Sequence, residues 1–104
     1  MELIVCGVLK IVKELKMLKI LDFYAQWCGQ CRKMMPMIDE VIELYNDRIH
    51  FEKINAEENK HTAEKYGVYS LPCIIFLRDN NEILKITGMI TKSKLIDTIE
   101  ELIK

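Results

Sequence analysis

Two cysteines separated by two residues are the side chains in this sequence best suited to chemistry. Cys28 and Cys31 lie in the run WCGQC, directly after an apolar segment. Such a pair can exchange between dithiol and disulfide, bind a metal ion or remain as structural thiols. A structural zinc site needs four ligands, and the further ligands Cys73, His50 and His61 could reach the pair only through the tertiary fold. The pattern therefore favours redox exchange as the function of the pair, with metal binding and a structural role as alternatives.

The segments on either side of the pair predict where it sits in the fold. The nearly continuous apolar run from Lys19 to Ala25 is typical of a strand covered on both faces, and Cys31 to Tyr45 carries an apolar stripe at helical spacing. The start of a helix presents unpaired N–H groups and the positive end of its dipole, which favour an anion such as a thiolate. We expect Cys28 to be the exposed nucleophile, and Cys31 to be the less exposed thiol that resolves the mixed disulfide.

The remaining periodic segments predict an α/β protein. Short strands are expected at Leu3–Cys6, Ile49–Asn55, Cys73–Leu77 and Glu82–Met89, and helices at Val8–Met17, Glu57–Tyr66 and Leu95–Ile103. The acidic start of the helix at 57–66 suits its dipole. A turn is expected at Asp79-Asn80-Asn81. The chain of 104 residues, without linker or repeat, is expected to form a single domain over residues 1–104.

Composition narrows the class of protein. Half of the residues are hydrophobic, 30% are charged and the formal net charge is −1, so neither a nucleic acid nor an anionic membrane is an expected partner. The apolar run Leu3 to Leu9 lacks a basic stretch before it and a cleavage pattern after it. We therefore expect a soluble protein of the cytoplasm, where a close cysteine pair indicates redox chemistry or metal binding more often than structural disulfides.

A single aspartate interrupts the apolar strand before the pair. A buried carboxylate such as Asp22 needs a partner, a hydrogen bond or a proton. Lys53 has the same strand parity as Ile49 and Phe51, so its side chain is expected on their face of the sheet. The pattern makes Lys53 a candidate charge partner of Asp22, although each side chain could instead reach solvent.

The run DFYAQWCGQC resembles the active-site run of the thioredoxin family, whose usual form is Asp-Phe-x-Ala-x-Trp-Cys-Gly-Pro-Cys. The similarity continues through the segments KMMP, FEKIN, YGV and Leu71-Pro72 to Gly88, and it spans about residues 18–104. The resemblance implies a thioredoxin fold: a central five-stranded mixed sheet of order 1-3-2-4-5, flanked by four helices. It also implies that the Leu71–Pro72 bond is cis and packs against the cysteine pair.

The resemblance further implies a function and a set of site residues. The protein would be a protein disulfide reductase that works through a reversible Cys28–Cys31 disulfide. Asp22 would act as general base for Cys31, with Lys53 beside it. Client segments would dock on a flat surface whose members are Trp27, Gly29, Leu71, Pro72 and Gly88. Neither a cofactor nor a metal would be bound.

The expected partners are disulfide-containing client proteins and a thioredoxin reductase, either a flavoprotein using NADPH or a ferredoxin-dependent enzyme, with the chain itself a monomer. Two departures from the family pattern leave alternatives open. Gln30 replaces the usual proline, so the pair is expected to be less reducing and the protein could be a more oxidising isomerase. Cys73 replaces a usual threonine; it is expected to be a small buried side chain, but it could join the pair in binding a metal or iron–sulfur cluster.

Overall fold

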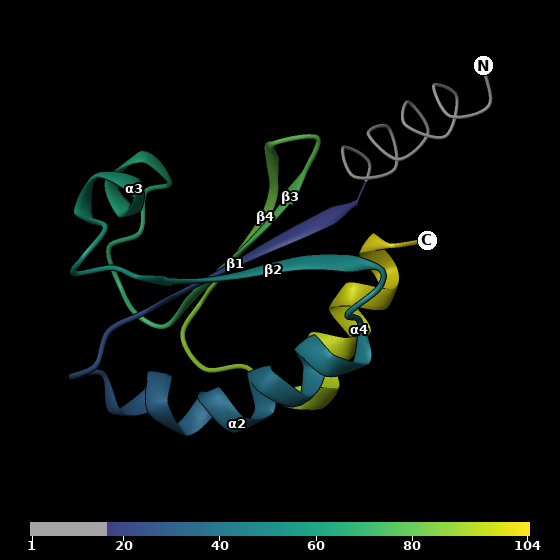
Figure 1. The fold of residues 1–104 in the computed structure, drawn as a ribbon, viewed down its shortest axis with the longest axis horizontal. Coiled ribbons are helices and arrows are strands. Elements are labelled where there is room, and N and C mark those ends of the chain that lie inside the picture. Colours follow the sequence, from purple (N-terminus) through teal and green to yellow (C-terminus); the bar gives the residue numbers. More distant parts are fainter. Residues whose placement is uncertain (1–16) are drawn as a thin grey trace, which may run out of the picture.

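The architecture was taken from a computed structural model that describes residues 17–104 (Figure 1). Its elements, in chain order, are β1 (Leu18–Tyr24), α2 (Gly29–Leu44), β2 (Ile49–Asn55), α3 (Lys60–Lys65), β3 (Cys73–Arg78), β4 (Asn81–Thr87) and α4 (Lys92–Leu102). The predicted strand at residues 3–6 and all but the last residue of the predicted helix at residues 8–17 lie outside the described part. Within residues 17–104, no helix is long and apolar enough to cross a membrane.

The strands form a mixed sheet in the order β2-β1-β3-β4. β1 runs parallel to β2 and antiparallel to β3, and β3 pairs antiparallel with β4. This order matches the part 3-2-4-5 of the order expected from the resemblance, so the predicted α/β thioredoxin fold is confirmed. The described residues hold four strands and three helices, against the five and four expected for the whole chain.

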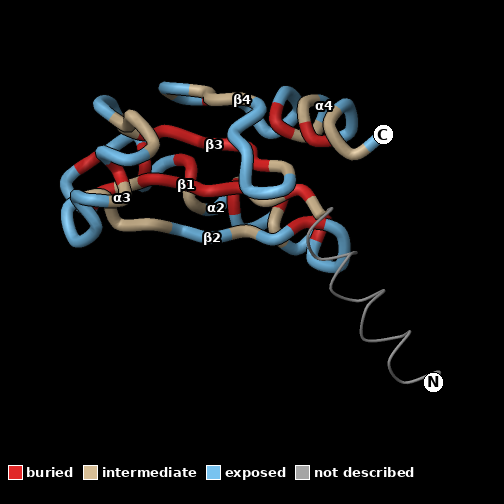
Figure 2. The backbone as a smooth tube through the Cα atoms, turned by 90° about the horizontal axis from the view of Figure 1, so that it is seen from above, coloured by how far each residue is buried: buried red, intermediate tan, exposed pale blue. Residues whose placement is uncertain are grey.

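Helices cover both faces of the sheet, and the alternation of side chains along β1 decides what each face buries. Leu18 and Ile20 pack with residues of α2 and α4, whereas Leu21 and Phe23 pack on the other face with Ala63 of α3. Figure 1 shows α2 and α4 together on one side of the strands. Figure 2 shows β1 and β3 as the most buried strands, because each has a neighbouring strand on both sides.

The helix α3 is shorter than the sequence predicts. It begins at Lys60 rather than Glu57, because the Asn55 side chain accepts hydrogen bonds from the N–H groups of Glu57 and Glu58, at 3.0 and 3.3 Å. An asparagine that bonds to the backbone in this way competes with helix formation. The expected acidic first turn of this helix is therefore wrong, since both glutamates precede it.

α3 ends at Lys65, one residue before the predicted end at Tyr66. Gly67 has a φ of 66°, and its N–H donates to the carbonyl of Glu64 while the N–H of Val68 donates to that of Ala63, at 3.0 and 2.9 Å. This pair of bonds is the Schellman motif, which needs a left-handed residue that glycine adopts without strain. The motif turns the chain from α3 toward Leu71 and Pro72.

The hairpin between β3 and β4 also differs in detail from the prediction. Arg78 pairs with Asn81, so the loop holds only Asp79 and Asn80, with φ of 53° and 65°. Positive φ at both central residues is the type I′ arrangement that suits the twist of a two-residue hairpin. The left-handed positions are therefore Asp79 and Asn80, and Asn81, the third residue of the predicted turn, is the first residue of β4.

Candidate active site

The cysteine pair lies where β1 gives way to α2. The N–H of Cys28 donates to the carbonyl of Ala25 at 3.1 Å, and Cys28 then caps α2 in an extended conformation. Its sulfur accepts a hydrogen bond from the N–H of Cys31 at 3.2 Å. Cys28 and Cys31 form a disulfide, with their Cα atoms 5.3 Å apart. The predicted position of the pair at a helix start is confirmed. The hydrogen bond from the Cys31 N–H favours negative charge on the Cys28 sulfur once the disulfide is reduced.

Both cysteines are buried in this disulfide state. Cys28 is 6% exposed and Cys31 is 4% exposed, so the expected order of exposure holds only by a small margin. The expectation of an openly exposed first sulfur is wrong for this state. The sulfurs cover each other, and Tyr24 and Leu71 pack against the pair. Only a small part of Cys28 is therefore accessible in this state.

Pro72 and Gly88 lie together at the start of β3 and the end of β4. The Leu71–Pro72 bond is cis, as the resemblance implies, and the N–H of Gly88 donates to the carbonyl of Pro72 at 2.8 Å. Gly88 has a φ of 97°, which strains any residue with a Cβ atom. Leu71 packs against the cysteines. The first residue of the cis peptide bond is therefore itself part of the site.

Trp27, the neighbour of Cys28 in the chain, and Tyr69 are the most exposed large apolar side chains of the described residues, at 67% and 88%. Trp27 and Leu71 line a cleft of about 480 Å³ whose other members are Ala56, Lys60, Ala63, Glu64, Val68, Tyr69 and Ser70. Sequence reasoning named Trp27 and Leu71 but missed the wall that α3 and the loop after it provide. An aromatic residue in the short polar loop before Leu71-Pro72 was the signal that could have indicated it.

Asp22 is buried within the sheet, with 6% of its surface exposed. Burial raises the pKa of its carboxyl from 3.8 to about 6, while the charge of Lys53 lowers it and that of Asp39 raises it. The register places Asp22 directly opposite Lys53 on the neighbouring strand. A carboxyl with this pKa can hold or release a proton near neutral pH, as a general acid or base must.

The ammonium group of Lys53 is bonded to Asp39 of α2. This differs from the direct pairing with Asp22 that the sequence suggested, because the ion pairs of residues 17–104 include none between Asp22 and Lys53. Lys53 does share the parity of Ile49 and Phe51, and that face is the one covered by α2. Asp39 is therefore a partner that strand periodicity could not indicate.

Cys73 is buried and forms no disulfide. Its sulfur lies 4.0 Å from the Thr87 hydroxyl, and burial raises the pKa of its thiol. The predicted small buried side chain is confirmed. Within residues 17–104, no group of three or more histidine, cysteine or acidic side chains is arranged to hold a metal ion.

The site as a whole defines a class of protein, a thiol–disulfide oxidoreductase. A disulfide lies at a helix start, Leu71 of the cis Leu71–Pro72 bond packs against it, and the strand that leads to it carries a buried carboxyl. Comparison with known proteins agrees. A family model described as thioredoxin matches residues 9–101. Thioredoxin 1 of Synechococcus elongatus is 33% identical over 82 residues, covering 79% of this chain and 77% of that protein.

Further relatives extend the likeness. The M-type chloroplastic thioredoxin of Pisum sativum is 36% identical over 84 residues, covering 81% of this chain and 49% of its own. The crystal structure of Fasciola hepatica thioredoxin superposes with a TM-score of 0.78 at 30% identity, covering 93% of this chain and 92% of its own. The chain belongs to the thioredoxin family, and it is a protein disulfide reductase.

Proposed function

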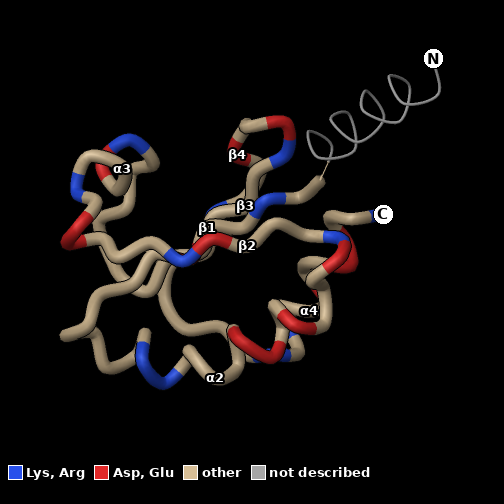
Figure 3. The backbone as a smooth tube through the Cα atoms, in the orientation of Figure 1, with Lys and Arg blue, Asp and Glu red and all other residues tan. Residues whose placement is uncertain are grey.

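We propose that the chain reduces client disulfides by a two-step exchange in which Cys28 attacks and Cys31 resolves. The observation that carries this order is the position of Cys28 as cap of α2, with its sulfur bonded by the N–H of Cys31. Arg32 and Lys33 follow within the first two turns of α2 and add positive charge there. Figure 3 shows this positive charge near the start of α2. These features favour the thiolate, which is the nucleophilic form of cysteine.

In the first step, the Cys28 thiolate attacks one sulfur of the client disulfide. An enzyme–client S–S bond forms, and the other client sulfur leaves as a thiolate that takes a proton from solvent. In the second step, Asp22 accepts the proton of the Cys31 thiol. The Cys31 thiolate attacks the sulfur of Cys28, the enzyme–client bond breaks, and the second client sulfur leaves as a thiolate. The client gains two electrons, and the enzyme ends as the Cys28–Cys31 disulfide.

Asp22 suits the role of base because burial raises the pKa of its carboxyl to about 6. Such a carboxyl is largely ionised at neutral pH, yet it binds a proton more tightly than an exposed aspartate does. Lys53 adjusts that affinity through its charge. Asp22 keeps 6% of its surface exposed, and through this opening it can return the proton to water.

The docking surface of the proposal consists of Trp27, Gly29, Leu71, Pro72 and Gly88. Trp27 and Gly29 are exposed, Leu71 and Gly88 are half-buried, and Pro72 is buried. An extended client segment could lie across Trp27 and Leu71, with its backbone near the cis-proline. The cleft between Trp27 and Tyr69 continues this surface toward α3.

The proposal also covers the oligomeric state, the compartment and the partners of the protein. The chain acts as one domain and as a monomer in the cytoplasm, where a reducing environment keeps the dithiol usable. Either a flavoprotein using NADPH or a ferredoxin-dependent reductase returns it to the dithiol. Disulfide-bearing proteins that expose an extended segment are its clients.

Covalent trapping tests the order of attack. With Cys31→Ser, the first step can occur but the second cannot, so client proteins should accumulate as disulfide-linked complexes on non-reducing gels. The matched control is Cys28→Ser with Cys31→Ser, which should trap nothing, and Cys28→Ser alone should trap far less than Cys31→Ser. Equal trapping by the two single variants would contradict the assignment of Cys28 as the attacking thiol.

A further inference from the structure

Three charged side chains from β1, β2 and α2 lie close enough to act on one another. Asp22 of β1 and Lys53 of β2 are register partners on parallel strands, and both have the parity that faces α2. The ammonium of Lys53 reaches across to Asp39 of α2 and forms an ion pair there. Asp39 keeps 57% of its side chain exposed and Lys53 keeps 34%, while Asp22 is buried.

We propose that Asp39 is a positioning residue that holds the Lys53 ammonium on α2, away from Asp22, and so keeps Asp22 able to take the proton of Cys31. This inference rests on the proposed role of Asp22 as general base. It gives Asp39 a function that neither its exposure nor its place in the helix would suggest. One lysine is shared by two carboxylates, and the position of its charge decides how strongly Asp22 binds a proton.

The physical argument concerns where a single positive charge lies. An ammonium group within about 4–6 Å of an aspartate lowers its pKa by roughly 1–3 units. Direct pairing of Lys53 with Asp22 would therefore cancel much of the increase that burial causes. Bonded to Asp39, Lys53 lowers the pKa of Asp22 only in part, and the negative charge of Asp39 raises it. Asp39 thus raises the pKa of Asp22 in two ways, by its own charge and by holding the Lys53 ammonium.

The other ionisable groups around Asp22 carry no charge that would change its pKa. Cys73 of β3 is close enough for the charge of Asp22 to act on it. Burial raises the pKa of the Cys73 thiol, so this thiol stays neutral. Cys28 and Cys31 carry no charge while they are bonded to each other. Among the residues that the structure describes, Lys53 from β2 and Asp39 from α2 are therefore the charges that act on Asp22.

The direct test is a titration of Asp22 itself. In the oxidised protein, the side-chain carboxyl carbon of Asp22 is followed by NMR from pH 4 to pH 9. Asp39→Asn should lower the midpoint by about one unit, since Lys53 is released toward Asp22 and a negative charge is lost. Asp39→Glu, which can hold Lys53 again, should restore most of the midpoint. An unchanged midpoint in Asp39→Asn would overturn the proposal.

Matched variants separate positioning from a simple loss of charge. Glu40→Gln removes one negative charge from the next residue of α2, where the carboxylate is bonded to Lys92 at 2.7 Å instead. It should move the midpoint much less than Asp39→Asn does. In a Lys53→Gln background, Asp39→Asn should also lose most of its effect. A full effect in that background would show that Asp39 acts by its own charge, which contradicts the positioning role.

The kinetic readout distinguishes failure of this inference from failure of the proposed function. Release of a peptide from the mixed disulfide is measured in a single turnover across the same pH range, and the rate should rise with the ionisation of Asp22. In Asp39→Asn this rise should move to lower pH, and the plateau should fall several-fold because the base is weaker. If Asp22→Asn released peptide at the native rate, the general-base role would fail, while the NMR titration would still judge the link between Asp39 and Lys53.

Discussion

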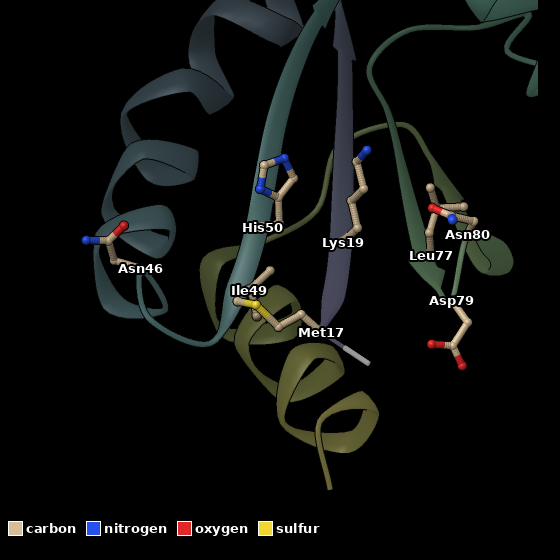
Figure 4. Close-up of a pocket in the computed structure, with 8 residues that line it drawn as sticks. All are labelled: Met17, Lys19, Asn46, Ile49, His50, Leu77, Asp79 and Asn80. Carbon is tan, nitrogen blue, oxygen red and sulfur yellow. The ribbon is translucent and has the colours of Figure 1, made fainter. Parts of the chain in front are cut away.

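The two ends of β1 carry hollows of similar size but of different chemistry. Beyond Tyr24 lie the cysteine pair and a cleft of about 480 Å³ beside Trp27. At the Leu18 end there is a pocket of about 520 Å³ (Figure 4), lined by Met17, Lys19, Asn46, Ile49, His50, Leu77, Asp79 and Asn80. The larger hollow thus has a histidine, a lysine and an aspartate on its walls, yet it lacks the reactive pair.

Besides the cysteine pair, burial of the ionisable side chains distinguishes the two ends. Lys19, His50 and Asp79 are half-buried or exposed, and Lys19 shares its charge with Glu52 at 3.4 Å. At the other end, burial raises the pKa of Asp22 to about 6, and two sulfurs stand at a helix start. Solvated charges are stabilised by water, whereas a buried one is poised to exchange its proton. Cavity size is therefore a poor guide to the site in this protein.

Removing the attacking sulfur should break the comparison most completely. Cys28→Ser should lower the rate of insulin reduction with dithiothreitol as donor by on the order of 10³-fold or more, because the covalent step is lost. At the opposite end, His50→Ala should keep the rate within about twofold, as expected for a side chain outside the reaction. A comparable loss in His50→Ala would show that the pocket at the Leu18 end takes part.

The next largest effect should appear in stability. Because burial raises the pKa of Asp22 from 3.8 to about 6, the folded protein binds this proton more tightly than the unfolded chain does. The resulting stabilisation is complete below about pH 3.8 and is lost as the pH rises through 6. Asp22→Asn cannot ionise. Relative to that variant, the native protein should lose about 3 kcal/mol of unfolding free energy between acidic and neutral pH.

Urea unfolding of both oxidised proteins, from about pH 3.5 to pH 7.5, measures this difference across the interval in which Asp22 changes charge. Glu52→Gln, which removes a solvated carboxylate, serves as the control and should follow the native curve closely. Parallel curves for the native protein and Asp22→Asn would mean that burial does not raise the pKa of Asp22.

Local patterns predicted most of the elements that build the site. The bounds of β2 were predicted to the residue, and the start of α2 fell on the cysteine pair because strand and helix periodicities meet there. The burial of Asp22 followed from its place in an apolar strand. These features depend on side-chain periodicity along a short segment, which the sequence displays directly.

The features that sequence reasoning missed depend on contacts between distant segments or on competition within one. The bond of Lys53 to Asp39 exists because α2 lies over β2, and in the sequence Asp39 is one more polar residue on a helix. The late start of α3 reflects capture of two N–H groups by the Asn55 side chain. The burial of both sulfurs follows from the disulfide and from Leu71, which joins the site from far along the chain.

The smallest expected effect concerns Gln30 and the reduction potential of the cysteine pair. Gln30 is the second residue of α2, so its N–H belongs to the first turn, where backbone donors have no partner within the helix. Donors at a helix start stabilise a thiolate, and stabilising the reduced pair raises its reduction potential. Gln30→Pro removes this N–H and should lower the potential by about 30 mV, which corresponds to about 1.4 kcal/mol for two electrons.

Gln30→Ala is the matched control, because it removes the side chain and keeps the N–H. Its potential should stay close to the native value when all three proteins are titrated against glutathione. Equal potentials for the native protein and Gln30→Pro would show that this donor does not act on Cys28. A native potential near about −180 mV would instead match the disulfide isomerases, and it would turn the same site from reducing its clients to rearranging their disulfides.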